Sequence, residues 1–185
     1  MKAIDRVIDY AVELNLGTDI EKDFDTRFRL QKITCLMSRF ITGENYNFSL
    51  YIRGPYSPTL TKEYFDPINQ EKLKKKQKSR DITGDEKEAI IKLKQIINEG
   101  TNNRLEIMAT AYFLIKNRTA DWSNLYETIK KIKPRVKEED VVLGINDAKI
   151  WLITKEQWAK ALEDLKEDME FWDKASVHSM GSYLE

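Results

Sequence analysis

The side chains that most often carry out catalysis are scarce in this chain and poorly placed for it. His178 is the only histidine and lies in a C-terminal serine-containing segment, so a Ser-His-Asp or Cys-His arrangement would have to use it. Cys35 is the only cysteine, which excludes an intramolecular disulfide and a cysteine-based zinc site. Its place within a helical pattern predicts an ordinary half-buried residue rather than a reactive thiol. The seven glycines form neither G-x-x-x-x-G-K-[ST] nor G-x-G-x-x-G. We therefore expect no enzymatic activity, no cofactor and no bound metal.

Acidic residues cluster at positions 138–140 and again at 163–173, and paired carboxylates can carry out acid–base or metal chemistry. In the second cluster, helical spacing places the acids opposite an apolar stripe of Trp158, Leu165 and Trp172, which predicts a solvated face. Tryptophans in such a stripe are more typical of a core. An exposed stripe would instead be a docking surface for a partner. The role of this helix is left open.

The stretch from residue 28 to residue 65 organises the rest of the chain and is typical of helix, strand, tight turn and short helix. Helical spacing is shown by Leu30, Ile33, Met37, Phe40 and Ile41. Apolar and polar residues then alternate, which predicts a half-buried strand with one face formed by Tyr46, Phe48, Leu50 and Ile52. Gly54-Pro55 would end that strand, and Ser57 followed by Pro58 would open a short helix.

Apolar periodicity predicts further helices, at residues 2–15, 84–99, 104–117, 122–132, 141–148 and 154–172. Thr83 and Glu86 match a capping box at the start of one of them. The strand needs a mate, and the segment from Leu73 to Ile82 is the best candidate. The expected fold class is therefore mainly α (α+β), a helical domain of six to seven helices with a small antiparallel β-hairpin. The predicted order of elements is helix, strand, helix and basic strand. This order resembles a winged-helix layout, but the comparison is only an analogy.

Composition is that of one compact domain with a heavily charged surface. The chain has 185 residues, 41% hydrophobic and 34% charged, with a formal net charge of +0, so no global field favours nucleic acid or membrane. No apolar run approaches the roughly 20 residues that a membrane span needs, and charges interrupt the N-terminal apolar run, unlike a signal peptide. We expect a cytoplasmic protein with a helical domain at residues 1–150. Residues 151–185 are expected to form an amphipathic helix and a mobile tail, packed on the same domain.

A basic segment follows the short helix. Between residues 71 and 80, a single acid, Glu71, faces six basic residues: Lys72, Lys74, Lys75, Lys76, Lys78 and Arg80. Such a cluster can contact phosphates of nucleic acid or an acidic partner. It can also be a solubilising loop or sheet edge, where lysines discourage strand-to-strand aggregation. We favour the second interpretation, because a basic cluster alone is a weak motif.

Three segments carry a resemblance to a known family: Arg29-Leu30-Gln31-Lys32-Ile33, Tyr46-Asn47-Phe48 and Tyr51-Ile52-Arg53-Gly54-Pro55-Tyr56-Ser57-Pro58. A further match lies at 104–111, RLEIMATA, and Lys133-Pro134 fits the spacing that follows. In this order the segments resemble the Panacea family, which includes the SocA-like antitoxins and the YwgA-like proteins. The matches span most of residues 28–134. One departure is Arg53, where relatives often carry Tyr or Lys.

The resemblance implies a non-enzymatic protein that neutralises a cognate toxin by direct binding, or a regulator encoded beside one. It brings no catalytic residues. The residues around the Gly-Pro bend are the candidate partner-binding site: Tyr51, Arg53, Gly54, Pro55, Tyr56 and Ser57. The opposing interpretation is a turn kept for folding alone. The alternative function is a winged-helix DNA-binding regulator that touches DNA through residues 57–66 and the basic segment. A homodimer is left open.

Overall fold

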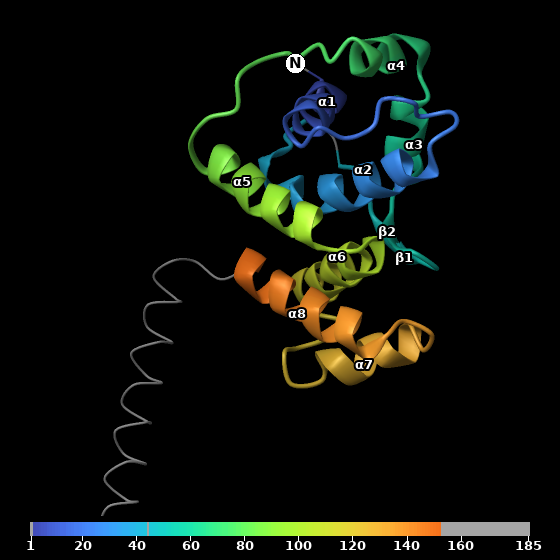
Figure 1. Ribbon diagram of the computed structural model, residues 1–185, viewed down its shortest axis with the longest axis vertical. Coiled ribbons are helices and arrows are strands. Elements are labelled where there is room, and N and C mark those ends of the chain that lie inside the picture. The colour runs from blue at the N-terminus through green and yellow to red at the C-terminus, as the bar shows by residue number, and fades with distance from the viewer. Residues whose placement is uncertain (1, 44, 153–185) are drawn as a thin grey trace, which may run out of the picture. The chain divides into compact units, whose positions relative to one another are not determined.

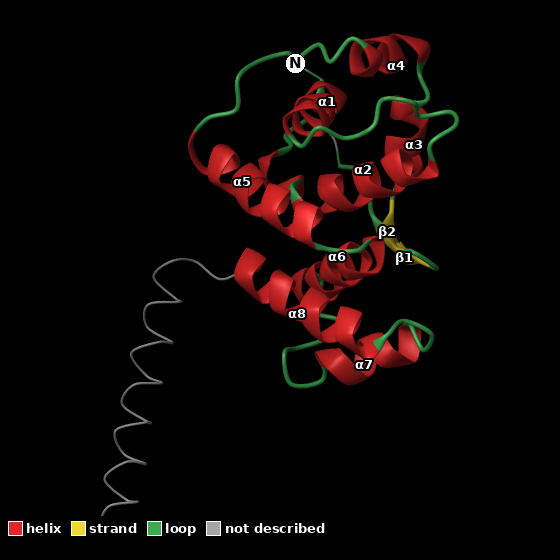
Figure 2. Cartoon of the chain, in the orientation of Figure 1, coloured by secondary structure: helices red, strands yellow, loops and turns green. Residues whose placement is uncertain are grey.

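The computed structural model describes residues 2–43 and 45–152 (Figure 1). These residues form eight α-helices, one short 3-10 helix and one two-stranded sheet. The elements are α1 (Ala3–Glu13), α2 (Phe24–Leu36), η1 (Ser38–Phe40), β1 (Ser49–Tyr51), β2 (Gly54–Tyr56), α3 (Pro58–Tyr64), α4 (Pro67–Lys74), α5 (Gly84–Glu99), α6 (Asn102–Lys116), α7 (Leu125–Ile132) and α8 (Glu138–Leu152). The expected mainly α domain with a small antiparallel hairpin is confirmed (Figure 2).

Helices α2 and α6 pack against each other at the centre of the fold. Helices α1, α3 and α4 lie toward α2, whereas α7 and α8 lie toward α6 (Figure 1). Helix α6 is buried throughout residues 105–112, which makes it the core helix. Helix α8 approaches it closely at Gly144, where an added Cβ would lie 2.6 Å from the Cβ of Ile107. An ion pair between Arg104 and Asp147, 2.5 Å from Nε to Oδ2, joins the same two helices.

Capping side chains determine where several helices begin. Ser57 caps α3 as predicted, because its Oγ accepts the N–H of Leu60 at 3.1 Å and Pro58 fills the first helical position. Helix α2 begins before the apolar periodicity starts, because Asp23 caps it. Asp66 accepts the N–H of Ile68 at 3.0 Å, so the Asp-Pro pair that ends α3 also starts α4.

The predicted mate of the strand is wrong. Strand β1 pairs with β2, which follows it directly, in the register Ser49↔Tyr56, Leu50↔Pro55 and Tyr51↔Gly54. The segment 73–82 instead contains the end of α4 and an irregular loop, and the buried Leu73 anchors α4 in the core. Gly54-Pro55 therefore belongs to the returning strand rather than ending the sheet. The hairpin precedes the short helix α3, so the basic segment adds no strand to this order.

The predicted buried face of the strand is only partly formed. Tyr46 is 4% exposed, Phe48 and Leu50 are half-buried, and Ile52 is 93% exposed. Regular alternation stops because β1 has only three residues and the chain turns at Ile52 and Arg53. A single apolar side chain is thereby placed in solvent at the turn.

A buried polar network joins α1 to α5. The guanidinium of Arg6 donates to Asp9 at 2.9 Å and to Glu86, and the hydroxyl of Tyr10 donates to Glu86 at 2.7 Å. The predicted capping box at Thr83 is wrong, because its side chain makes no cap hydrogen bond and the glutamate carboxylate faces α1. Arg80 completes the network from the preceding loop, 2.8 Å from Glu86 Oε2.

The described residues up to Trp151 belong to one compact unit of the chain. The predicted helix with Trp158 and Trp172, its acidic residues, and His178 lie outside the described residues. None of the described helices combines the length and the apolar character that crossing a bilayer requires.

Candidate functional site

The hairpin exposes three consecutive side chains at its turn, Tyr51, Ile52 and Arg53, which we call the hairpin tip. Tyr51 is 53% exposed and Ile52 is 93% exposed. The guanidinium of Arg53 stacks on the ring of Phe24, 5.2 Å from its centroid, and that ring is itself half exposed. Exposed aromatic, isoleucine and arginine side chains together are typical of an interface between proteins.

The other four residues of the predicted binding site lie at the base of the hairpin. Gly54, Pro55 and Ser57 are buried and Tyr56 is half-buried. Gly54 has a φ of 80°, and an added Cβ would lie 2.8 Å from Oγ1 of Thr110 on α6, so only glycine fits. The structure thus brings the predicted residues together but separates them into an exposed tip and a buried base. Gly54, Pro55 and Ser57 are too buried to touch a partner while the hairpin stays docked, whereas Tyr56 remains partly accessible.

Two buried lysines hold the hairpin through its carbonyl groups. Lys32 on α2 donates to the carbonyl oxygen of Pro55 at 2.9 Å. Lys133, which follows α7, donates to the carbonyl oxygen of Ile52 at the turn. Both lysines are at most 5% exposed. Hydrogen bonds from charged donors are stronger than those between neutral groups, so the backbone on either side of Arg53 is fixed.

Glu106 on α6 is the carboxylate beside these lysines. Its Oε1 lies 2.5 Å from Nζ of Lys133, and both side chains are buried. Burial lowers the pKa of Lys32 to about 8, although the negative charge of Glu106 works in the opposite direction. The ring of Phe28, 4.8 Å from Nζ of Lys32, faces the same ammonium group. The hairpin is therefore held by a compact cluster of two cations and one anion.

The lowered pKa of Lys32 predicts a pH dependence of stability. Between the folded pKa of about 8 and the ordinary lysine pKa of 10.5 in the unfolded chain, the unfolded chain binds more protons, so this group makes the folded state more stable as pH rises. From pH 8 to pH 10, wild type should gain about 2 kcal/mol in free energy of unfolding relative to Lys32→Met. Urea unfolding of both proteins across this range measures the difference. If the difference in free energy of unfolding between the two proteins stayed constant from pH 8 to pH 10, the ammonium group of Lys32 would not be buried as described.

An amide side chain fixes the exit from the hairpin. Gln31 Oε1 accepts the N–H of Ser57 at 2.9 Å, and Gln31 Nε2 donates to the carbonyl oxygen of the same residue at 3.1 Å. The hydroxyl of Ser57 donates to the carbonyl oxygen of Tyr46. Gln31 is thus bonded to one backbone residue in both directions, which sets the direction in which the chain enters α3.

The polar residues that hold the hairpin are those that carry the family resemblance. Gln31 and Lys32 come from the first matching segment, Glu106 and Thr110 from the later one, and Lys133 from the Lys-Pro pair. We did not predict these residues as part of the site from their own properties. These residues do lie within the segments that resemble the family. The spacing of those segments along the chain does not show that the residues meet around one hairpin.

The basic segment is largely engaged by acids. Four of its six cations form ion pairs: Lys72 with Asp5, Lys75 with Glu71, Lys78 with Glu13 and Asp81, and Arg80 with Glu86. Lys76 donates to the amide oxygen of Asn15, and Lys74 is exposed. Three of these carboxylates, Asp5, Glu13 and Glu86, lie on α1 or α5, so the segment is bound to its own domain. These pairs reduce the positive field that phosphates would meet.

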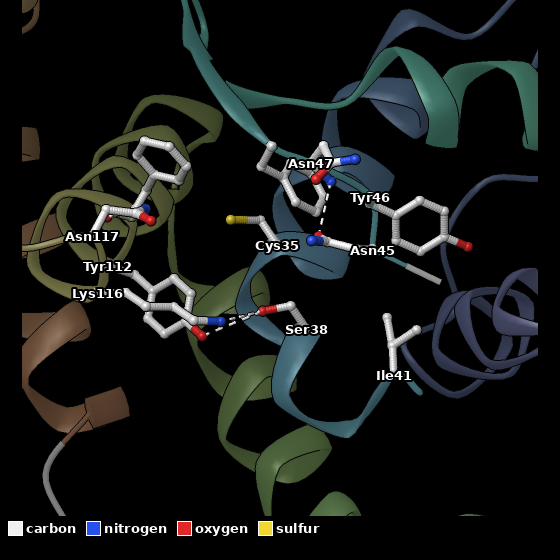
Figure 3. Close-up of a pocket in the computed structure, with 11 residues that line it drawn as sticks. Cys35, Ser38, Ile41, Asn45, Tyr46, Asn47, Tyr112, Lys116 and Asn117 are labelled. Atoms are coloured by element: carbon white, nitrogen blue, oxygen red, sulfur yellow. Dashed lines mark hydrogen bonds between the residues drawn. The ribbon is translucent and has the colours of Figure 1, made fainter. Parts of the chain in front are cut away.

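A separate cavity of about 450 Å³ opens between the end of α2, the loop at 41–48 and the end of α6 (Figure 3). Lys116 Nζ lies 2.9 Å from Oγ of Ser38, which lies 3.5 Å from the hydroxyl of Tyr112. Cys35 borders the cavity and is buried rather than half-buried, which raises the pKa of its thiol to about 12. The thiol therefore stays protonated and weakly nucleophilic at neutral pH.

Within the described part of the chain, no group of three or more His, Cys, Asp or Glu side chains is placed to hold a metal ion. The hairpin is the candidate site that we favour, because it combines a buried cluster of charged side chains with exposed side chains at its tip. In this arrangement the buried charged groups fix a backbone conformation, and the side chains of the hairpin tip are exposed to solvent. No protein-family model, no curated protein and no solved structure matches the chain.

Proposed function

We propose that this protein is a non-enzymatic protein-binding module, an antitoxin-like protein that neutralises a cognate toxin by direct contact through the hairpin tip. The observation that carries the proposal is that Ile52 is 93% exposed while its own carbonyl oxygen is held by the buried Lys133. A rigid backbone that presents an apolar side chain to solvent has already lost the conformational freedom that binding would otherwise remove.

The chemistry of the tip indicates what the partner offers. Arg53 lies against Phe24, and the guanidinium of Arg27 lies 5.8 Å from the centroid of the same ring. Two cations around one exposed ring favour a surface that combines a carboxylate with an apolar contact. The Panacea-like motifs also support the antitoxin-like assignment, because residues from several of them hold the same hairpin.

Co-expression and binding with the product of the neighbouring gene test the proposal. Wild type should restore growth of cells that express that product and should retain it in a pull-down. Arg53→Glu should weaken the affinity at least about tenfold, as reversal of an interface charge does. The matched control is Lys74→Glu, the same reversal at an exposed lysine of the basic segment, which should change the affinity less than about twofold.

The same pair of variants separates protein binding from DNA binding. A DNA-binding protein would lose salt-dependent retention of duplex DNA in Lys74→Glu and keep it in Arg53→Glu. Failure of wild type to bind the neighbouring product, together with no rescue of growth, would contradict the antitoxin assignment.

A further inference from the structure

The outer edge of β1 carries backbone groups that the hairpin leaves unpaired. Leu50 faces Pro55, which has no N–H and whose carbonyl oxygen is taken by Lys32. In an antiparallel pair, hydrogen-bonded and non-hydrogen-bonded positions alternate, so Leu50 occupies a non-hydrogen-bonded position. Its N–H and C=O therefore point away from β2. Within residues 2–43 and 45–152, no residue beyond the hairpin forms a backbone hydrogen bond with Leu50.

This edge lacks the features by which proteins protect exposed strands. Residues 48–52 read Phe-Ser-Leu-Tyr-Ile, without a charge or a proline. Ser49 and Tyr51 are exposed, and the strands project from the margin of the helical body (Figure 2). The lysines of the basic segment, for which the sequence predicted a loop or a sheet edge, lie on α4 and the following loop and do not protect this edge. The edge is thus open to another strand.

We infer that two copies of this chain associate by antiparallel pairing of their β1 edges around a two-fold axis at Leu50. An antiparallel edge is complementary to itself, because the N–H and C=O of one Leu50 meet the C=O and N–H of the other. The formal net charge of +0 means that no overall repulsion opposes the approach of two copies. This inference does not depend on the proposed function, but both contacts use Tyr51 and Ile52, so the dimer and a toxin would compete for the hairpin tip.

The register also places the exposed isoleucine. With Leu50 facing Leu50, Tyr51 of one copy lies opposite Ser49 of the other, and the turn residue Ile52 of one copy comes near Phe48 of the other. Phe48 and Leu50 of both copies, with the exposed turn residue Ile52 at each end, then form an apolar row across the axis.

The contact is small, because β1 has three residues. An interface of this kind falls below about 1,200 Å² and is typical of weak, reversible association. We therefore expect a dimer that forms in a concentration-dependent way, in the micromolar range or weaker.

Disulfide trapping tests the register in the full chain. In Leu50→Cys the two introduced residues face each other with Cα atoms about 5.5 Å apart, within the range of a disulfide. In the control Ser49→Cys, the two introduced residues are about 8 Å apart and outside that range. Cys35 does not interfere, because it is 3% exposed. Under mild oxidation, Leu50→Cys should form covalent dimer at least about tenfold faster than Ser49→Cys.

Sedimentation analysis of wild type, Ile52→Asp and Ile68→Asp gives a second, independent measurement. Ile52→Asp should raise the dimer dissociation constant at least about tenfold, because it places two carboxylates in the apolar row. Ile68→Asp alters another exposed isoleucine, on α4 and 68% exposed, and should leave the dissociation constant unchanged. A chain that stays monomeric up to about 1 mM, equal trapping of the two cysteine variants, or a dimer weakened by Ile68→Asp alone would each overturn the inference.

Discussion

Replacing Glu106 with glutamine should lower the free energy of unfolding by about 3–5 kcal/mol. Glutamine keeps the size of the side chain and an acceptor oxygen for Lys133, but it removes the negative charge. Lys32 and Lys133 would then remain buried, 3% and 5% exposed, without the carboxylate beside them. Unpaired charges in a protein interior cost several kcal/mol, so the loss should be large for a change of one atom.

Urea unfolding at pH 7 measures this loss, with Glu127→Gln on the exposed side of α7 as the control. The control should change the free energy by less than about 0.5 kcal/mol. The double variant Glu106→Gln/Lys133→Met should recover part of the lost stability, because it removes one of the two uncompensated cations. A loss below about 1 kcal/mol in Glu106→Gln would mean that the cluster is hydrated and does not hold the hairpin.

Arg6→Met should destabilise the fold by a similar amount, about 3–5 kcal/mol. Arg6 is 2% exposed and neutralises Asp9, which is 0% exposed, and Glu86. Methionine fills most of the space but leaves two buried carboxylates facing each other. Arg80 still pairs with Glu86, but its side chain is 42% exposed and cannot replace a buried cation.

The Arg6→Met defect should also depend on pH. Burial alone would raise the pKa of Glu86, but hydrogen bonds from Arg6 and Tyr10 outweigh it, and the pKa is lowered. Glu86 therefore adds stability to wild type above its unfolded pKa, and this stability is lost as pH falls through the folded pKa. In thermal unfolding, the gap between the midpoints of wild type and Arg6→Met should narrow toward acidic pH. The exposed control Arg135→Met should have the same midpoint as wild type at every pH. A difference that widens in acid would contradict the ion-pair network.

Local patterns in the sequence predicted most helices, because helices depend on neighbouring residues. Ser57 and Pro58 began a helix as their chemistry requires. No helix was predicted at residues 67–74, although aspartate followed by proline, as at Asp66-Pro67, is typical of a helix start. The strand mate was assigned wrongly because hairpin pairing depends on a tight turn, which here includes the left-handed conformation of Gly54.

The candidate site was predictable at its surface but not at its base. Tyr51 and Arg53 were chosen because they lie beside a Gly-Pro pair, and both are exposed. The residues that fix them come from distant segments, and Lys133 is 81 residues from the carbonyl group of Ile52 that it binds. No periodicity or spacing links residues that far apart, since only the folded backbone brings a lysine on one segment to a carbonyl on another.

The hairpin is held at two carbonyl groups by lysines from opposite ends of this unit, and that arrangement orders events during synthesis. A nascent chain that has emerged only as far as α6 contains Lys32 and Glu106 but lacks Lys133. Its turn is tied on the Pro55 side alone. The hairpin therefore reaches its final geometry only after Lys133 has left the ribosome, when α7 has been synthesised and most of the unit can already fold.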